Sequence, residues 1–192
     1  MFESFKIYIS DKATLTENEL ERIESLSVEK KLRKKQYLLQ EGEVDKHLTF
    51  IVKGCLRSYR VSSDGYEHIL NFGIENWWMG DFESHITGSP SKSNIDALED
   101  SELLIWAVGN FKLLLAEIPG LKLFYERSYQ KRLAAVNNRI YDVISSSAED
   151  KYNDFIKKYP DIFNRVPLHM IASYLGVSRK TLSRVRGQFA NK

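Results

Sequence analysis

The feature that most constrains the fold is the stretch IASYLGVSRKTLSRVR, residues 171–186. Its apolar residues recur at intervals of three and four, which indicates two short amphipathic helices. Gly176 lies between them, where a left-handed residue would end the first helix, and Ser178 is a good N-cap for the second. The pattern predicts a helix-turn-helix in which Leu182 and Val185 of the second helix face inward.

The same region is strongly basic. No Asp or Glu follows Asp161, and residues 162–192 carry a charge of +6. The preceding 161 residues hold 22 basic and 26 acidic side chains, a charge of −4. This asymmetry indicates a module that binds a polyanion, joined to a neutral or acidic body. The alternative interpretation is a solvated cationic helix face.

Polar residues on the outer face of the second helix predict that the polyanion is double-stranded DNA. Residues near the N-terminus of a recognition helix reach base edges, and arginine can bind guanine O6 and N7 together. A helical hairpin that only packs is the competing interpretation. The outward residues of this predicted recognition helix (178–187) are Arg179, Lys180, Ser183, Arg184 and Arg186.

From about Val28 to Val108 the sequence changes to short apolar or alternating runs separated by turn residues. Runs such as YLLQ (37–40), LTFIVKG (48–54) and ELLIWAV (102–108) predict an antiparallel sandwich or barrel. The Ser-Ser-Asp-Gly sequence at 62–65 predicts the tip of a hairpin. Ahead of this region, Thr16 and Glu19 form a capping box that predicts a helix over 16–26.

A long helix is predicted from Leu121 to about Ile144, a stretch without Pro or Gly. Apolar residues spaced 4, 3, 4, 3 along it predict a short coiled-coil seam between two chains. The alternative is a helix that packs on the core of its own domain. Ser147 and Asp150 then predict the start of another helix. The predicted seam residues are Tyr129, Leu133, Val136, Ile140 and Val143.

Three segments resemble the Crp/Fnr family of bacterial transcription regulators. LGVSRKTLSRVR (175–186) is similar to the family's recognition segment, in which G-x-S-R-x-T-x-S/G-R is common. QEGEVDKHLTFIVKGCLRSYR (40–60) resembles its E-G-D/E…L-x-F-I-x-x-G-x-x-R-x-Y. TGSPSKSNIDALEDSELL (87–104) resembles its T-G-x-P-x-x-x-x-V-x-A-L-E-D-S-E-L. The resemblance covers nearly the whole chain, with the parts in the same order.

This resemblance implies an α+β fold. It consists of an N-terminal antiparallel β-roll (a double-stranded β-helix) with flanking helices, a long dimerisation helix and an all-α helix-turn-helix. The implied domains are an effector domain like the cyclic-nucleotide-binding domain over 1–120, the dimerisation helix over 121–146 and the DNA-binding domain over 147–192. A homodimer would read a palindromic site in double-stranded DNA, with RNA polymerase as a further partner. Arg179, Lys180 and Arg184 would contact bases, and Ser178 and Thr181 would lie near phosphates.

The sequence departs from the family at two places. Members that bind cyclic AMP have G-E-L, then R-S/T-A, where the arginine pairs with the cyclic phosphate. Here Gly80-Asp81-Phe82 replaces the first motif, and the uncharged Ser91 occupies the position of the phosphate-binding arginine. Because this charged contact is missing, we expect that cyclic AMP is not a tight ligand. The effector is unknown, and its implied pocket is Trp78, Gly80, Asp81, Phe82, Ser91 and Lys92. The usual β-hairpin wing is expected to be reduced or absent.

Other functions are less compatible with the residues. The single cysteine, Cys55, excludes an internal disulfide and an iron–sulfur cluster held by several cysteines. A cupin-like metal enzyme or small-molecule binder remains an alternative, although the chain has no H-x-H pair. A ligand-sensing dimer that acts through protein contacts is another. We expect no enzyme activity, cofactor, metal or membrane partner. The N-terminus lacks signal-peptide features, which favours a cytoplasmic protein.

Overall fold

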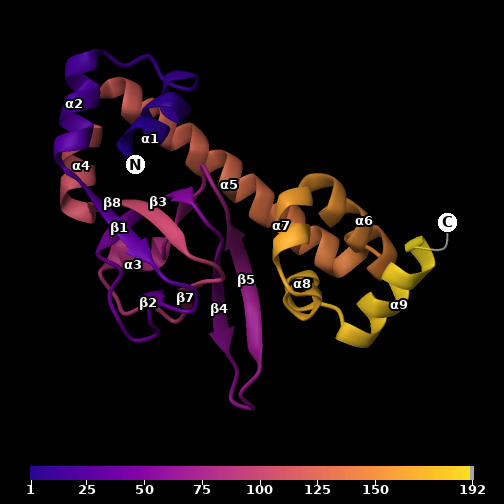
Figure 1. Cartoon of the computed structure of the whole chain (residues 1–192). Coiled ribbons are helices and arrows are strands. Elements are labelled where there is room, and N and C mark those ends of the chain that lie inside the picture. The colour runs from indigo at the N-terminus through magenta and orange to yellow at the C-terminus, as the bar shows by residue number, and fades with distance from the viewer. Residues whose placement is uncertain (191–192) are drawn as a thin grey trace.

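The computed structural model describes the backbone of residues 1–190 and the side chains of residues 1–188. A β-roll lies at one end of the molecule and a group of short helices lies at the other (Figure 1). The long helix α5 (Pro119–Ser145) connects them. No described helix is both long and apolar enough to cross a lipid bilayer.

The roll consists of two four-stranded sheets, with strand orders β1-β8-β3-β6 and β2-β7-β4-β5. All paired strands are antiparallel, which confirms the predicted roll. The predicted hairpin tip joins β4 to β5, where the Ser62 amide donates to the Tyr66 carbonyl at 3.0 Å. The strands are β1 (Ser27–Leu32), β2 (Tyr37–Leu39), β3 (His47–Lys53), β4 (Leu56–Val61), β5 (Glu67–Gly73), β6 (Trp78–Met79), β7 (Asn94–Ala97) and β8 (Ser101–Ala107).

Helices flank the roll on the side from which α5 begins. The predicted capping box is confirmed at α2, because Thr16 and Glu19 bond each other's backbone amides. Gly120, near the start of α5, lies so close to the Thr14 carbonyl that a Cβ would stand 2.6 Å from that oxygen. The helices of this part are α1 (Phe2–Ser10), α2 (Glu17–Ser25), α3 (Phe82–Thr87) and α4 (Val108–Glu117).

We call the group of buried residues between these helices and the first sheet the first core. Aromatic rings dominate it: Phe5 packs edge-on against Phe50 at 5.1 Å between ring centroids, and Trp106 lies 5.2 Å from Phe5. The Trp106 indole N–H donates to the Ile23 carbonyl at 3.0 Å. The first core comprises Phe2, Phe5, Ile9, Leu20, Ile23, Leu48, Phe50, Leu104, Trp106, Phe111, Leu114, Ile118, Leu121 and Phe124.

The short helices after α5 form the helical module: α6 (Ala148–Lys158), α7 (Pro160–Arg165), α8 (Leu168–Leu175) and α9 (Arg179–Ala190). This module packs directly on β4 and β5 through a second core. No strand follows β8 within residues 1–190, so the described part of the chain has no wing, as expected. The second core comprises Cys55, Tyr59, Ile69, Phe72, Tyr152, Phe155, Ile162, Val166, Ile171, Ala172, Leu175, Leu182 and Val185.

Candidate DNA interface and effector pocket

Helices α8 and α9 form the predicted helix-turn-helix. Gly176 ends α8 in the left-handed region, with φ 66°, and its amide bonds the carbonyls of Ala172 and Ser173. A side chain is disfavoured at that φ, which explains the glycine. Ser178 caps α9: its Oγ accepts the Thr181 amide at 3.0 Å and lies 2.8 Å from Thr181 Oγ1. The turn therefore has the geometry that its sequence predicts.

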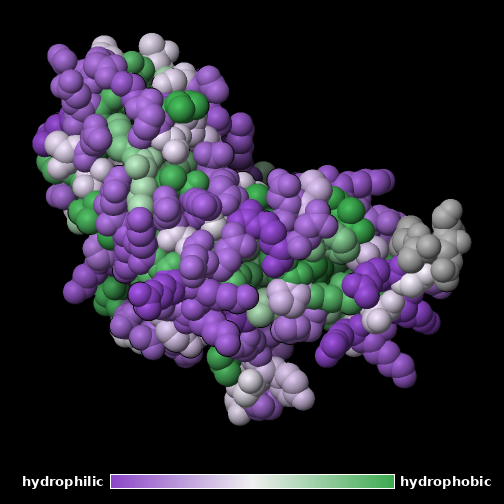
Figure 2. All heavy atoms as spheres, in the orientation of Figure 1, coloured by the Kyte–Doolittle hydropathy of each residue, from purple (hydrophilic) through white to green (hydrophobic). Residues whose placement is uncertain are grey.

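The outer face of α9 is cationic and open. Leu182 and Val185 are buried, at 0% and 3% exposure, which fixes the orientation of the helix. Hydrophilic side chains project from this end of the molecule in Figure 2. Thr181 is half-buried, and α9 extends to Ala190, beyond the predicted end at residue 187. The exposed residues among those predicted to contact DNA are Ser178, Arg179, Lys180, Ser183, Arg184 and Arg186.

The cations of this face are not paired with any carboxylate that the structure describes. Within the described residues, no salt bridge joins a carboxylate to any cation of α9. The other described cation of the basic region behaves differently. Arg165 ends α7 and binds two acidic residues of the roll: its Nη1 lies 2.7 Å from Glu75 Oε2, and its Nη2 pairs with Glu99. Arg165 thus attaches the helical module to the roll, whereas the α9 cations are available to a polyanion.

Arg139 of α5 is a second attachment, which no sequence motif predicted. Its Nη2 donates to the Ile69 carbonyl of β5 at 3.2 Å and to the Tyr174 carbonyl of α8 at 2.8 Å. Its guanidinium also lies 3.9 Å from the centre of the Tyr174 ring. Burial lowers the pKa of Arg139. One side chain therefore connects the roll, the long helix and the helix-turn-helix.

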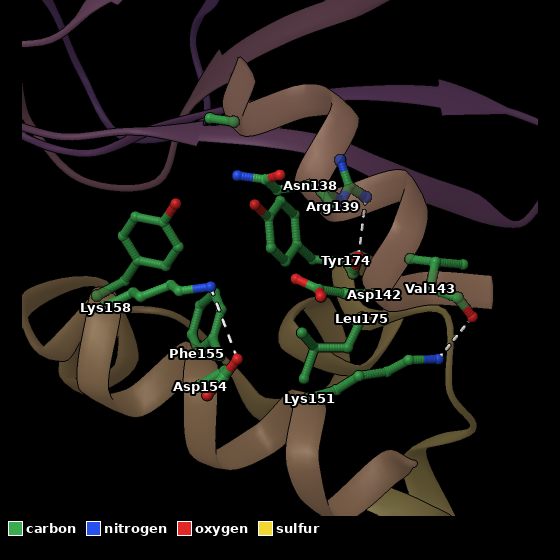
Figure 3. Close-up of a pocket in the computed structure, with 12 residues that line it drawn as sticks. Asn138, Arg139, Asp142, Val143, Lys151, Asp154, Phe155, Lys158, Tyr174 and Leu175 are labelled. Carbon is green, nitrogen blue, oxygen red and sulfur yellow. Dashed lines mark hydrogen bonds and ion pairs between the residues drawn. The ribbon is translucent and has the colours of Figure 1, made fainter. Parts of the chain in front are cut away.

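A cavity of about 160 Å³ adjoins Arg139 between α5, α6 and α8 (Figure 3). Its two lysines already have partners inside the molecule. Lys151 Nζ donates to the Val143 carbonyl at 2.8 Å, and Lys158 Nζ lies 3.6 Å from Asp154 Oδ2. None of the six residues predicted for the effector pocket lines this cavity.

The predicted seam lies along one exposed face of α5. The first turns of α5 are anchored in the first core by Leu121 and Phe124, but the seam residues beyond them face solvent. Figure 2 shows hydrophobic residues gathered where α5 meets the helical module, within a largely hydrophilic face. The exposures are 42% for Tyr129, 51% for Leu133, 48% for Val136, 54% for Ile140 and 41% for Val143.

The two residues at the family's ligand-binding positions are bonded to each other. Ser91, only 3% exposed, donates its hydroxyl to Asp81 Oδ2 at 2.6 Å, and Asp81 Oδ1 caps α3 through the Ser84 amide at 3.2 Å. Burial raises the pKa of Asp81, but these hydrogen bonds outweigh it and the net shift is downward. Lys92 instead points to solvent, 3.6 Å from Glu83.

The remaining residues predicted for the pocket lie in different environments. Trp78 is part of the aromatic packing around the first core, 5.4 Å from Phe50. Phe82 packs on α5, with its ring 5.2 Å from Tyr129, and the Arg132 guanidinium lies 4.8 Å from its centre. Gly80 has φ 153°, and a Cβ there would stand 2.8 Å from His85 Cε1. The structure therefore brings Asp81 and Ser91 together but turns Trp78 and Lys92 elsewhere.

A buried pair beside this region had no sequence signal. His85 Nε2 lies 2.9 Å from Asp45 Oδ2, and the same carboxylate oxygen accepts the Asp81 amide at 2.8 Å. Asp45 is 36 positions from Asp81 and 40 from His85, and no motif connects them. In the part of the chain that the structure describes, no three His, Cys, Asp or Glu side chains are placed to hold a metal ion.

Comparisons with known proteins agree with this arrangement. The family described as the cyclic nucleotide-binding domain matches residues 29–117. Relatives named fumarate and nitrate reduction regulatory protein, from Yersinia pestis and Escherichia coli, are 27% identical over 188 residues, covering 92% of this chain and 74% of theirs. These relatives are regulators rather than enzymes.

Solved structures have the same fold. FixK2 from Bradyrhizobium japonicum matches with a TM-score of 0.74 and 17% identity, covering 86% of this chain and 85% of that one. CLP from Xanthomonas campestris, described as a c-di-GMP responsive global regulator, matches with a TM-score of 0.74 and 14% identity over 92% of both chains. Together with the helix-turn-helix geometry, these findings show that the chain contains a cyclic nucleotide-binding domain and is similar over most of its length to transcription regulators of the Crp/Fnr type.

Proposed function

We propose that the chain acts as a homodimer that reads an inverted repeat in DNA with α9, and that cyclic AMP is not its effector. In this proposal residues 1–120 form the effector domain, 121–146 the dimerisation helix and 147–192 the DNA-binding domain. The observation that carries it is the face of α9: exposed cations and hydroxyls near the helix N-terminus, without a neutralising carboxylate among the described residues.

The position of the cations on α9 favours base recognition. Arg179, Lys180 and Arg184 lie in the first two turns, and Leu182 and Val185 hold the opposite face in the second core. Each bidentate contact of arginine with guanine contributes about 1–3 kcal/mol of discrimination. Ser178 and Thr181 remain as predicted phosphate contacts, with hydroxyls that already bond each other.

The exposed seam supports a dimer. Five large apolar side chains in one row are half-exposed in the single chain. Full burial of such a side chain contributes about 1.5–3 kcal/mol, so two copies packed along this row would gain a substantial free energy. A two-fold dimer would present its two α9 helices to successive major grooves about 34 Å apart.

The bonds of Asp81 and Ser91 support independence from cyclic AMP. A cyclic phosphate would meet a neutral hydroxyl already donated to Asp81, rather than a guanidinium. The Lys92 ammonium does not replace it, because it lies beside Glu83 at the surface. A charge-assisted hydrogen bond contributes about 1.5–3 kcal/mol, and this site lacks the main one.

Selection of binding sequences from random duplexes tests the DNA proposal. We expect enrichment of an inverted repeat and binding that weakens steeply with salt, because phosphate contacts release counterions. Arg184→Ala should relax selectivity at one base pair of each half-site, whereas Lys122→Ala, which removes an exposed cation from α5, should leave the selected sequence unchanged. Absence of an inverted repeat would contradict the proposal.

Two further measurements test its other parts. The double change Leu133→Glu and Ile140→Glu should give a monomer in sedimentation analysis, whereas Lys131→Glu, on the opposite face of α5, should stay dimeric. A monomeric parent protein would contradict the dimer. Isothermal titration with cyclic AMP should show no binding in the low micromolar range, and tight binding would overturn the proposed independence from this ligand.

A further inference from the structure

The cavity between α5, α6 and α8 has a lining that the proposed function does not use. Its volume is about 160 Å³. The lining residues come from α5, from α6 with its C-cap Tyr159, and from α8, so they belong both to the long helix and to the helical module. A molecule bound in this cavity would therefore contact α5 and the helical module at the same time.

Asp142 of α5 contributes a carboxylate without a partner. The residue is half-buried, and its carboxylate forms no hydrogen bond or ion pair among the side chains that the structure describes. Arg139 lies three positions earlier on the same helix, where an ion pair is favourable, but its guanidinium bonds backbone carbonyls instead. Lys151 likewise donates to the Val143 carbonyl. Because an unpaired carboxylate loses free energy when water is removed from it, this position favours a ligand with a cationic group.

Lys158 of α6 contributes a cation on another side of the cavity (Figure 3). Its Nζ lies 3.6 Å from Asp154 Oδ2, which is too long for a hydrogen bond. Both of these side chains are exposed, so the cavity is open to solvent at this edge. No described ion pair joins Lys158 to Asp142. Two opposite charges thus face one cavity without neutralising each other.

Apolar side chains form much of the remaining wall. Phe155, only 3% exposed, packs against Tyr174 with 5.5 Å between the ring centroids. A cavity of about 150 Å³ can hold benzene, so this one accepts a ligand with a small apolar body. Pockets for drug-sized ligands measure about 300–1,000 Å³, so a nucleotide is too large for it. The other apolar lining residues are Ala135, Val143 and Leu175.

A small molecule that carries both charges and an apolar body matches this lining. A ligand with only a positive charge would be repelled by the three basic side chains of the lining, and one with only a negative charge would leave Asp142 unpaired. We propose that the cavity binds a free α-amino acid with an apolar side chain. Its ammonium group binds the Asp142 carboxylate, its carboxylate binds Lys158 Nζ, and its side chain packs on Phe155. The site does not depend on the proposed binding of DNA by α9.

Isothermal titration of the full chain with L-alanine, L-valine, L-leucine and L-methionine tests the ligand class. We expect at least one of them to bind with a Kd below about 1 mM. The tightest ligand is then compared with the same molecule without its ammonium group and without its carboxylate; for valine these are 3-methylbutanoate and isobutylamine. Each analogue should bind at least tenfold more weakly, because one charged group of the cavity loses its partner. Absence of binding by all four amino acids, or equal binding by the analogues, would overturn the inference.

Two pairs of variants test the site itself. Asp142→Asn keeps the shape of the side chain but removes its charge, and Glu126→Gln removes the same charge from an exposed position of α5 outside the cavity. Lys158→Met is matched in the same way by Lys157→Met. Each cavity variant should lose at least tenfold in affinity for the amino acid, and each control should bind it like the parent. Circular dichroism establishes that all four fold. Parental affinity in both cavity variants would overturn the inference.

Hydrogen exchange locates the bound amino acid. A ligand that contacts α5 and the helical module stabilises the arrangement in which they are packed together, so exchange should slow in α6 and α8 of the parent protein. The same concentration should give no protection there in Asp142→Asn. Protection confined to the roll would place the ligand in a different pocket and overturn the inference. None of these measurements includes DNA, so their failure would leave the proposed function intact, and a failure of DNA binding would leave this site intact.

Discussion

The first and second cores differ in what surrounds their apolar residues. Aromatic rings fill the first core. The Phe5 ring, for example, contacts the rings of Phe50, Trp78 and Trp106. The second core lies between two modules and is bordered by charges. Arg165 bonds Glu75 and Glu99 at one edge, and Arg139 bonds backbone carbonyls at another. The first core stabilises the roll and its flanking helices, whereas the second core holds the roll and the helical module together.

This difference indicates different modes of opening. The first core draws residues from α1, α2, α4, the start of α5 and the first sheet, so we expect that it cannot separate without unfolding the roll. We expect the second core to open by movement of the helical module away from β4 and β5, with each side keeping its own secondary structure. Regions of a protein do open as separate cooperative units. We call the contact between the roll and the helical module, made by the second core with Arg139 and Arg165, the joint. We therefore expect changes in the first core to affect global stability and changes at the joint to affect docking of the helical module on the roll.

The largest effect is expected from Trp106→Ala. Trp106 is fully buried and its indole N–H is bonded, so truncation leaves a cavity and an unpaired Ile23 carbonyl. The free energy of unfolding should fall by about 3–5 kcal/mol in urea denaturation. Tyr66→Ala, at the exposed hairpin tip, should change it by less than about 0.5 kcal/mol. A similar small loss for Trp106→Ala would remove the distinction between the cores.

Arg139→Met tests the joint with a side chain of similar length that lacks charge. The carbonyls of Ile69 and Tyr174 lose a charged donor, which costs about 1–3 kcal/mol of docking free energy. Cys55 reports opening, because it is buried in the second core and burial raises the pKa of its thiol to about 12. Alkylation of Cys55 should accelerate by about 5- to 150-fold.

The control for this experiment is Arg132→Met, which changes the arginine of α5 that packs on Phe82 rather than at the joint. It should leave alkylation of Cys55 at the parent rate. Equal acceleration by both variants would show that the thiol reports general loosening of α5 instead of undocking.

Much of the fold could be predicted because its signals are local. Alternating runs and turn residues predicted strands at 37–40, 48–54 and 102–108, which correspond to β2, β3 and β8. A glycine followed by an N-cap serine predicted the helix-turn-helix. Helix α1 was missed although Phe2, Phe5 and Ile9, all buried, recur at helical spacing. The short strand β6 and the helix α7 were also missed, since neither is long enough to show a period.

The contacts of the candidate sites could be predicted less well. The exposed faces of α5 and α9 follow from helical period alone. The joint does not, because Arg139 and Arg165 bind residues that lie from 35 to 90 positions away in the sequence. Neighbouring residues of a strand face opposite sides. The sequence therefore does not indicate which of the adjacent Trp77 and Trp78 rings enters the first core.

Acid should loosen the joint before it unfolds the roll. Burial raises the pKa of Glu75, but hydrogen bonds from Arg165 and the Gly54 amide outweigh it, and the net pKa is lowered. A carboxyl whose folded pKa is lowered stabilises the folded state above its unfolded pKa of about 4.3, and this contribution is lost as the pH falls through the folded value. Small-angle scattering should therefore show expansion in acid while the far-ultraviolet circular dichroism is retained.

Glu75→Gln imitates this protonation at neutral pH and should expand the molecule there. Glu83→Gln, which removes a carboxylate beside exposed Lys92, is the matched control and should not. If dichroism and scattering change together along the acid titration, the joint and the roll form one cooperative unit.

The smallest change in stability is expected at two matched N-caps, one beside the first core and one in the helical module. Thr16 caps α2 against the first core, and Ser147 caps α6 in the helical module. Replacing either by alanine should cost about 1 kcal/mol. Hydrogen exchange should accelerate throughout the roll in Thr16→Ala, but only in α6–α9 in Ser147→Ala. Identical exchange patterns would mean that the two regions do not open separately.

The length of α5 has a mechanical consequence. This helix spans 27 residues, or about 40 Å. Leu121, near its start, lies in the first core, and Val143, near its end, lies beside Gly176 in the turn of the helix-turn-helix. Close contact of Gly120 with the Thr14 carbonyl fixes its near end as a pivot. A tilt of about five degrees there would shift the far end by about 3 Å, and in the proposed dimer this shift would change the spacing of the two α9 helices.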